Sequence, residues 1–511
     1  MSELIGQLDD VITVALQNVP PPPTGEQVRE TIETLRKLPQ FSSISNDEAE
    51  ELAQAFEERH SVSMTVGSAL SEANYEPWFL AKKPELDLYF WNRYRKFLLQ
   101  KEHFPLDVIN KMDQVTDRIV DFLQNPEIPG VWDRRGLVVG YVQSGKTGNY
   151  TAVINKAADA GYKLIVVIAG VNNNLRNQTQ IRIDEGFTGR DSRNLHSSSK
   201  EKKLSGVGLI DSKRLPSTFT SATKEFHKAG ADSVKVPLEN MSEPAVLVIK
   251  KNSTVLKNLI EWLTVLNVSM GTKKISEPML LIDDEADNAS INVKYGKEEV
   301  STINRRLRDL LSLFERSCYV GYTATPFANI FIDPDTEDDL LGNDLFPRDF
   351  LVSLDAPSNY IGPEKVFLDE DNKTIIVIDD NQDSIPTKHK KDHVIHVLPE
   401  SLRRAIRQFV ITRAIRLSRG ETSFHSSMLI NASVYTAVQT RLHSKVHQEL
   451  VDIQASAKIM GAMPFKTAMS DKQIAYLYEV WKKDFCNSGT DWTQIQHLLN
   501  QSAGPIVTVH I

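Results

Sequence analysis

The chain has 511 residues, which exceeds one ordinary domain and predicts roughly two to four folded units. Its residues are 41% hydrophobic and 25% charged, the balance of a soluble globular protein rather than of a disordered or membrane-embedded one. The net charge of −8 argues against a surface that coats nucleic acid non-specifically, because such binding needs many Lys and Arg side chains. A local basic groove is compatible with this charge.

The two cysteines, Cys318 and Cys486, lie far apart and show no paired Cys/His spacing. This pattern excludes a disulfide framework and a structural zinc site, and it indicates a reducing compartment. The N-terminal residues lack the basic region of a secretory signal, and no apolar run approaches the roughly 20 residues that cross a bilayer. We therefore expect a cytoplasmic protein with no membrane partner.

Residues 1–130 are predicted to form a helical N-terminal region, because apolar residues recur there at three- and four-residue spacing. Over residues 131–335, short apolar runs such as LVVGYV, KLIVVIAGV and MLLIDD alternate with helical patterns. Buried strands that alternate with helices are typical of a parallel sheet covered on both faces. The predicted fold class is therefore α/β.

Two irregular stretches interrupt this pattern, a polar insertion near 188–243 and a linker or insertion at 336–393. After them, residues 394–511 predict a helix that stops at Gly420 and then a strand, SSMLINASV. The chain ends in GPIVTVHI, which reads as the start of another strand. We expect residues 394–511 to be part of a second α/β lobe, within a longer protein.

A phosphate-binding pattern, G-x-x-x-x-G-K-[ST], is matched by GYVQSGKT at residues 140–147, between a strand and a helix. Backbone N–H groups of such a loop surround the phosphates of ATP, Lys146 reaches the β- and γ-phosphate oxygens, and the Thr147 hydroxyl ligates Mg²⁺. The alternative is a glycine turn that matches by chance. The predicted nucleotide-binding residues are Gly140, Gln143, Ser144, Gly145, Lys146 and Thr147.

An acidic run, DDEAD, ends the apolar strand that begins at residue 279. At the carboxyl edge of a parallel sheet, these acids lie beside the phosphate loop. We expect Asp284 to hold Mg²⁺, and Glu285 to orient and deprotonate the attacking water. The alternative is a solvated strand end.

Two further segments follow strands. Thr323 and Thr325 in YTATP are expected, with Asp287, to link nucleotide state to the placement of two lobes, as in helicase-like ATPases; a β-turn before a proline is the alternative. Amides and arginines in NNNLRNQTQIR suit contacts with a nucleic-acid backbone, although a solvated helix start explains them equally well. The candidate contacts are Asn174, Arg176, Gln178, Gln180 and Arg182.

Together, the segments RRGLVVGYVQSGKTGNY, LIDDEADNASIN, YVGYTATPFANIFID and VIHVLPESLRRAIRQFVITRA resemble the Z-one putative endonuclease domain family, a bacterial group with a superfamily-two helicase-like P-loop ATPase core. The resemblance covers roughly residues 130 to 450. It implies a RecA-like ATPase lobe and part of a second one, with ATP and Mg²⁺ as cofactors. It also implies a motor that acts on DNA in restriction or anti-phage defence, with other defence subunits as partners and homo-oligomers as an option.

The sequence departs from that pattern in one respect. Helicase-like enzymes supply transition-state arginines from a Q-x-x-G-R-x-x-R-like helix, and no such segment follows residue 398. Arg403, Arg404 or Arg407 are the alternatives within this chain. No D-x(n)-[DE]-x-K arrangement supports nuclease chemistry. Two other functions therefore stay open beside the motor: an ATP-controlled assembly scaffold, and an ATP-dependent endonuclease whose nuclease site lies elsewhere.

Overall fold

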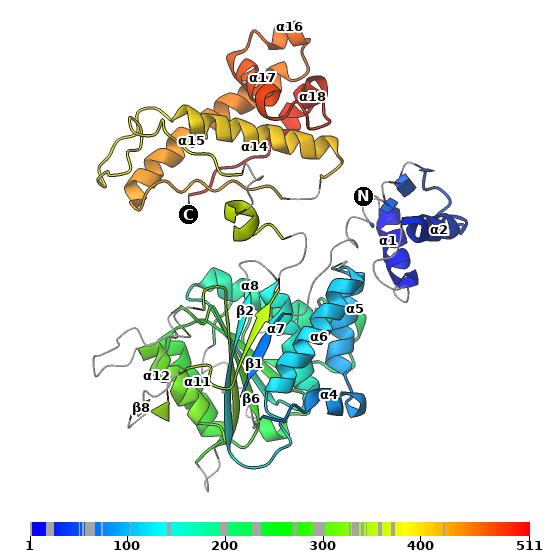
Figure 1. Cartoon of the computed structure of the whole chain (residues 1–511), viewed down its shortest axis with the longest axis vertical. Coiled ribbons are helices and arrows are strands. Elements are labelled where there is room, and N and C mark those ends of the chain that lie inside the picture. Colours follow the sequence, from blue (N-terminus) through cyan, green and yellow to red (C-terminus); the bar gives the residue numbers. More distant parts are fainter. Residues whose placement is uncertain are drawn as a thin grey trace. The chain divides into compact units, whose positions relative to one another are not determined.

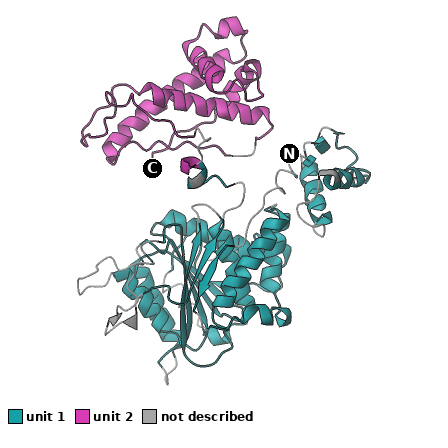
Figure 2. Cartoon of the chain, in the orientation of Figure 1, with its two compact units in different colours: residues 1–365 teal, residues 366–511 magenta. Residues whose placement is uncertain are grey.

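The computed structural model describes residues 3–16, 25–46, 48–50, 52, 53, 56, 67–72, 75–102, 104–140, 145–194, 203–226, 237–268, 273–288, 290, 302–326, 329, 337, 338, 342, 343, 345–355, 360–368, 374–422 and 425–510. The chain forms two compact units, Met1–Lys365 and Val366–Ile511 (Figure 2). Within these residues, no helix is both long enough and apolar enough to cross a membrane.

An eight-stranded sheet organises the first unit, in the order β1-β10-β2-β7-β6-β3-β5-β4. Its strands are β1 Ala69–Ser71, β2 Trp132–Gly140, β3 Leu164–Ala169, β4 Ser217–Thr218, β5 Ala245–Ile249, β6 Met279–Asp284, β7 Arg316–Thr323 and β10 Phe350–Leu354. Only the pairing of β1 with β10 is antiparallel in this sheet. The predicted α/β fold with a parallel sheet is therefore confirmed.

Helices cover both faces of this sheet (Figure 1). Successive side chains of a strand point to opposite faces, so Val167 packs in one apolar core and Val166 in another. The first core includes residues of α6 Leu106–Phe122 and α7 Lys146–Ala160, against which α5 Tyr89–Gln100 packs. The second core includes residues of α11 Ser253–Asn267 and α12 Thr302–Ser312. Continuous apolar strands are thus buried on both sides.

The predicted N-terminal helical region contains two groups of helices. Helices α1 Glu3–Ala15 and α2 Gly25–Arg36 form their own core, which includes Leu8, Ile12 and Val28. By contrast, Phe79 of α4 Phe79–Lys82 and Ile119 of α6 belong to the core of the sheet. Helices α4 and α6 therefore share the core of the sheet, whereas α1 and α2 have a separate one.

Residues 350–354 correct the prediction that 336–393 is irregular, since they form β10 beside β2. The backbone N–H of Arg135 donates to Asp349 Oδ2 at 2.6 Å, and the Asp349 N–H donates to the Arg135 carbonyl at 3.0 Å. These two bonds fix the register in which β10 joins the sheet. Shorter elements of the first unit are η1 Lys83–Glu85, α8 Asn173–Ile183, η2 Asp184–Thr188, η3 Ser192–Asn194, α9 Val207–Ile210, η4 Leu238–Asn240, β8 Glu337–Asp338 and β9 Gly342–Asn343.

The second unit is helical over the residues described, with η5 Glu364–Leu368 at the boundary between the units. Its helices are α14 Glu400–Ser418, α15 Thr436–Met460, α16 Phe465–Ala468, α17 Lys472–Asp484 and α18 Trp492–Ala503. Buried apolar side chains such as Val410, Ile453 and Leu477 join them in one core. In α14 the buried residues Ile406, Val410 and Ala414 recur every four positions, the spacing of a helix that packs through one face.

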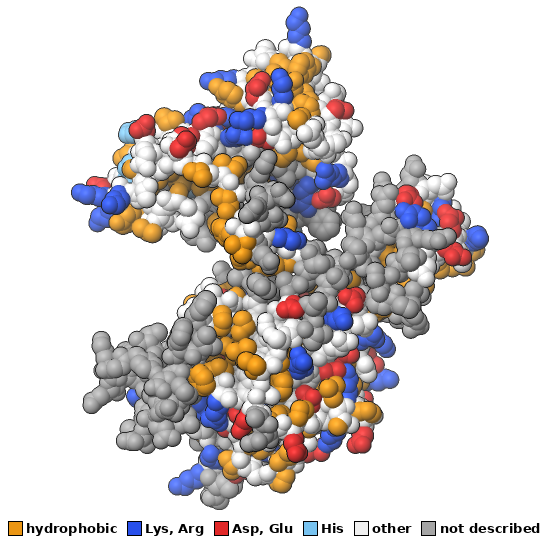
Figure 3. All heavy atoms as spheres, viewed as in Figure 1, with side chains coloured by type: hydrophobic (Ala, Val, Ile, Leu, Met, Phe, Trp, Pro, Cys, Tyr) orange, Lys and Arg blue, Asp and Glu red, His pale blue; other side chains and the backbone are white. Residues whose placement is uncertain are grey.

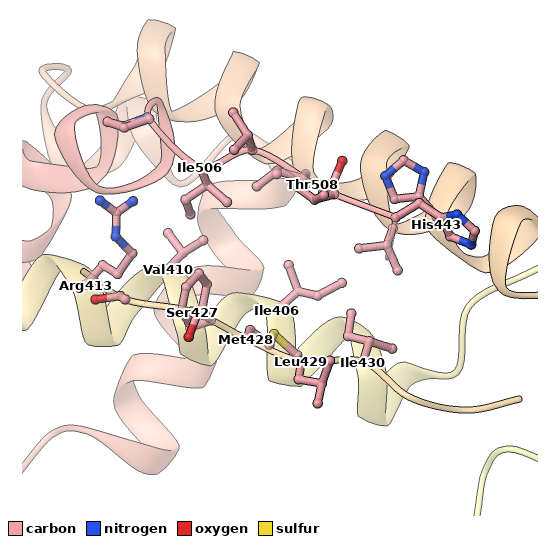
Figure 4. Close-up of a pocket in the computed structure, with 18 of the residues that line it drawn as sticks. Ile406, Val410, Arg413, Ser427, Met428, Leu429, Ile430, His443, Ile506 and Thr508 are labelled. Atoms are coloured by element: carbon pink, nitrogen blue, oxygen red, sulfur yellow. The ribbon is translucent and has the colours of Figure 1, made fainter. Parts of the chain in front are cut away.

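The predicted strand SSMLINASV is wrong, and with it the α/β character expected of residues 394–511. Residues 425–432 are extended, but over the described part of the chain no backbone hydrogen bond joins them to the extended residues 507–510. Instead, the two segments flank a cavity of about 810 Å³ together with Ile406 and Val410 of α14 and His443 of α15 (Figure 4). A β-prone sequence becomes a strand only where another backbone pairs with it.

Candidate nucleotide-binding site

The predicted phosphate and acidic motifs meet at one edge of the sheet. Gly140 ends β2, Asp284 ends β6, and Thr323 ends β7, which lies between them. The register pairs Asp284 with Tyr322 of β7, and Thr323 with Val139 of β2. Because these strands are parallel, their carboxyl ends lie at the same edge, where ligands of open α/β sheets bind.

Gly145 and Lys146 connect the phosphate loop to α7. Gly145 is the N-cap residue and has a φ of +90°, a left-handed conformation that glycine adopts without strain. The first helical residue is Lys146, so the unpaired N–H groups at the start of α7 adjoin the loop. Gln143 and Ser144 lie outside the described residues. The conformation of Gly145 and the start of α7 thus agree with the predicted phosphate loop at these two positions.

Lys146 is half-buried and lies in an acidic environment. Its Nζ donates to the Gly140 carbonyl at 3.2 Å. Burial lowers the pKa of Lys146, while the charges of Asp284, Asp287 and Glu285 favour its protonated form. The ammonium is therefore close enough to the acidic run to interact with its carboxylates.

Asp284 and Thr147 are brought together by a residue that the sequence analysis did not select. The hydroxyl of Tyr150 donates to Asp284 Oδ2 at 3.3 Å and also lies beside the Thr147 side chain. Burial raises the pKa of Asp284, the neighbouring carboxylates raise it further, and Lys146 opposes this effect. The spacing of Tyr150, three residues after Thr147 on one helix, is the signal that could have identified it.

Glu285 is exposed, with a φ of +57°, which is strained for a residue other than glycine. A buried lysine holds this turn: Lys251 Nζ donates to the Glu285 carbonyl, and to the Asn288 carbonyl at 2.9 Å. The same ammonium pairs with Asp283 at 3.0 Å, and both side chains are fully buried. Asp283 also accepts a bond of 2.7 Å from the Tyr319 hydroxyl. The buried Lys251 thus fixes the backbone conformation at Glu285.

Asp287 contacts both threonines with which it was grouped. Its Oδ1 accepts from Thr323 Oγ1 and its Oδ2 from Thr325 Oγ1, each at 2.7 Å. The end of β7 is therefore tied to the acidic run by two hydrogen bonds to a charged acceptor, the stronger kind. The role of these residues in linking nucleotide state to the placement of a second lobe stays a prediction.

The candidate nucleic-acid contacts divide between two faces of α8. Asn174, Gln178 and Arg182 are exposed, as side chains four residues apart on one helical face can be. Arg176 and Gln180 are buried, and for them the prediction is corrected. Arg176 donates to the Ser221 carbonyl at 2.6 Å, and Gln180 accepts from Thr220 at 2.7 Å, so both stabilise the lobe internally.

Arg182, although exposed, contacts Thr147, one of the predicted nucleotide-binding residues. Its Nη1 donates to Thr147 Oγ1 at 3.1 Å, across 35 residues of sequence. The arginines considered in the second unit are all paired within it: Arg407 with Glu400 and Glu449, Arg403 with Glu449, and Arg404 with Asp484. Arg407 is also buried.

The donor set suits Mg²⁺ bound together with a nucleotide. This ion is usually held by one or two carboxylates plus substrate phosphates rather than by a protein cage. Thr147 and Asp284 offer a hydroxyl and a carboxylate on either side of Tyr150. In the described ranges, no group of three or more His, Cys, Asp or Glu side chains could hold a metal ion by itself.

Residues 401–511 match the Z1 domain, a protein-domain family. This match supports the Z-one family for these residues of the second unit, but its extent differs from the predicted one of roughly residues 130 to 450, with which it overlaps only at residues 401–450. It does not reach the phosphate loop or the acidic strand. Among curated proteins, no significant match to the chain was found.

Proposed function

We propose that this protein binds and hydrolyses ATP as a helicase-like P-loop ATPase with a RecA-like core, and that it acts as a motor on DNA in bacterial restriction or anti-phage defence. The proposal of ATP use rests mainly on one observation, the meeting of Lys146, Asp284 and Glu285 at the carboxyl edge of a parallel sheet. The sheet order supports the proposal, because β7 separates the phosphate-loop strand from the acidic strand and carries its two threonines to the same edge.

Each residue has a definable role in this reaction. Lys146 binds the β- and γ-phosphate oxygens, and the N-terminus of α7 adds backbone N–H donors. Thr147 and Asp284 would hold Mg²⁺, which supplies positive charge against the phosphates. Glu285 orients the attacking water and accepts its proton, since phosphoryl transfer depends mainly on positioning and charge stabilisation.

The proposal of DNA as the substrate rests on the resemblance and on the exposed face of α8. Asn174 and Gln178 present amides that can contact phosphate oxygens without reading sequence. On the face shown in Figure 3, Lys and Arg side chains are interspersed with Asp and Glu. Such a surface suits a local contact with nucleic acid better than a broad non-specific one.

ATPase activity with and without single-stranded and duplex DNA tests this function. We expect wild-type hydrolysis to rise with DNA, and Lys146→Ala to lose hydrolysis in both conditions. The matched control is Lys257→Ala, which removes an exposed lysine from α11 and should behave as wild type. Absence of DNA stimulation in a preparation that hydrolyses ATP would contradict the motor and leave the ATPase standing.

A specific observation favours the scaffold as the second candidate. Leu429, Val507 and Val509 are 80%, 79% and 72% exposed along the two extended segments of the second unit. Clustered exposed apolar side chains typically mark surfaces that bind other proteins. ATP-dependent assembly measured by light scattering, without translocation along DNA, would favour this reading over the motor.

A further inference from the structure

The contact between Arg182 and Thr147 places a guanidinium at the position where the phosphates of a nucleotide are expected. Thr147 follows Lys146, and its hydroxyl accepts from Arg182 Nη1 at 3.1 Å. The Arg182 side chain is otherwise exposed, so it can turn toward a ligand without leaving a buried pocket. An exposed arginine beside the phosphate loop is chemically suited to bind phosphate, because its planar guanidinium can donate to two oxygens at once.

Buried hydrogen bonds hold helix α8, which carries Arg182, so the fold fixes the position from which Arg182 contacts Thr147. Gln180 donates to Asp184 Oδ1 at 2.9 Å and accepts from Thr220, and Arg176 donates to the Ser221 carbonyl. Both anchors are buried and lie within six residues of Arg182 in the sequence. At the other end of α8, the Asn172 side chain caps the helix by accepting from a backbone N–H. These contacts at both ends of α8 therefore keep the backbone of Arg182 at a fixed place near Thr147.

A source of positive charge is needed here, because Lys146 alone does not replace the arginine that helicase-like enzymes supply in the transition state. Arg403, Arg404 and Arg407 are engaged with carboxylates inside the second unit. Arg182 belongs instead to the unit that carries the phosphate loop. The positive charge can thus come from the same compact unit that carries the phosphate loop.

We propose that Arg182 is a catalytic residue that acts in cis, binding the γ-phosphate of ATP and stabilising the charge that develops during its transfer. In this step the water oxygen bonds to the γ-phosphorus while the bond from that phosphorus to the bridging oxygen breaks. The bridging electron pair stays on ADP, and Glu285 takes the proton of the water. Arg182 donates to the non-bridging γ-oxygens. This inference rests on the proposed ATPase function.

Three variants test it in the full chain: Arg182→Ala, Arg182→Lys and Arg193→Ala. Arg193 is a matched control, since it is an exposed arginine of the neighbouring η3 that pairs with Asp191. Arg182→Ala should lower kcat by about 1,000-fold or more, the lower end of the range known for transition-state arginines. Arg182→Lys keeps the charge but not the fork and should recover only part of the rate. Arg193→Ala should match wild type.

Nucleotide affinity measured by calorimetry provides a second measurement that needs no turnover. Arg182→Ala should weaken ATP binding by about tenfold or more while ADP binding stays within about threefold, because only ATP carries the γ-phosphate. An unchanged thermal unfolding temperature would show that the exposed substitution leaves the fold intact.

The outcomes separate the two proposals. If wild type hydrolyses ATP and Arg182→Ala retains both rate and ATP preference, the arginine proposal is wrong and the ATPase stands. If Lys146→Ala and wild type alike fail to bind ATP, the proposed function is wrong, and the proposal for Arg182, which depends on it, is wrong as well. Loss of ATP and ADP binding together in Arg182→Ala would point to a structural role and overturn the inference.

Discussion

Replacing Lys251 by Met tests whether the buried lysine fixes the backbone turn at Glu285–Asn288. The side chain of Met has nearly the same length but no charge or donor, so Asp283 would keep its hydrogen bond from Tyr319 and lose its ion pair. The carbonyls of Glu285 and Asn288 would also lose a donor. Because Glu285 has a positive φ, its strained conformation depends on such contacts. We expect both stability and kcat to fall.

The size of the effect follows from the burial of both partners. Removing one member of a buried ion pair typically costs about 3–5 kcal/mol, since the other charge stays uncompensated. The carbonyls of Glu285 and Asn288 add little to this cost, because each keeps a backbone donor, the Asn288 N–H at 2.9 Å and the Ser290 N–H at 2.8 Å. The double variant Lys251→Met/Asp283→Asn removes the isolated charge, so it should be more stable than Lys251→Met by about 2–4 kcal/mol.

Urea unfolding, followed by tryptophan fluorescence, measures these differences in the free energy of unfolding. Steady-state ATPase assays measure kcat, which depends on the position of Glu285. The transition of the sheet-containing unit must be used, because a chain of two units need not unfold in one step. We expect the double variant to regain stability but not kcat, with KM for ATP nearly unchanged. A stability loss below about 1 kcal/mol in Lys251→Met would refute the reasoning from the buried pair. Recovery of kcat in the double variant would show that the lysine does not position Glu285.

Three other predictions concern separate parts of the first unit. Lys146→Ala should weaken ATP binding by about tenfold or more, measured with a fluorescent nucleotide, because a charged donor to the phosphates is lost. Burial raises the pKa of Asp159 to about 7, so between about pH 4 and 7 the folded protein holds a proton that the unfolded chain releases. The free energy of unfolding should therefore fall as the pH rises through this range, and Asp159→Asn should remove that slope even if it shifts the absolute stability; an equal slope in both proteins would contradict this. Asn174→Ala/Gln178→Ala should weaken DNA binding without changing the unfolding temperature, whereas unchanged DNA affinity would remove α8 from the proposed contact surface.

The sheet and the site residues that carry local patterns could be predicted from the sequence. Apolar runs such as that at 279–284 form continuous buried strands, and a glycine with a φ of +90° stands where the phosphate pattern requires it. The grouping of Asp287 with Thr323 and Thr325 also corresponds to direct contacts. These features are encoded within a few consecutive residues. A single sequence is enough to read them.

Contacts between distant segments could not be predicted in the same way. Lys251 follows a different strand from the turn that it holds, and nothing near it in the sequence distinguishes it from a solvated lysine. In α8 the pattern shows polar residues but not which face is buried, so Arg176 and Gln180 were assigned to a surface they do not reach. The short strand β10 carries too few residues to show a period and depends on its pairing with β2.

The extended segments of the second unit show that a strand-like sequence alone does not make a strand. Residues 425–432 have the composition of a strand, and they line a cavity together with Ile406 and Val410 of α14 and Leu442 of α15. In the described residues no backbone hydrogen bond joins them to another segment, and their apolar side chains line a cavity (Figure 4). Burying such side chains is worth about 1.5–3 kcal/mol each, so a partner backbone would gain both hydrogen bonds and apolar contact there. In the first unit, where every central strand has two neighbours, composition and structure agree; sequence predicts where a strand can form, and the packing of the whole unit determines whether it does.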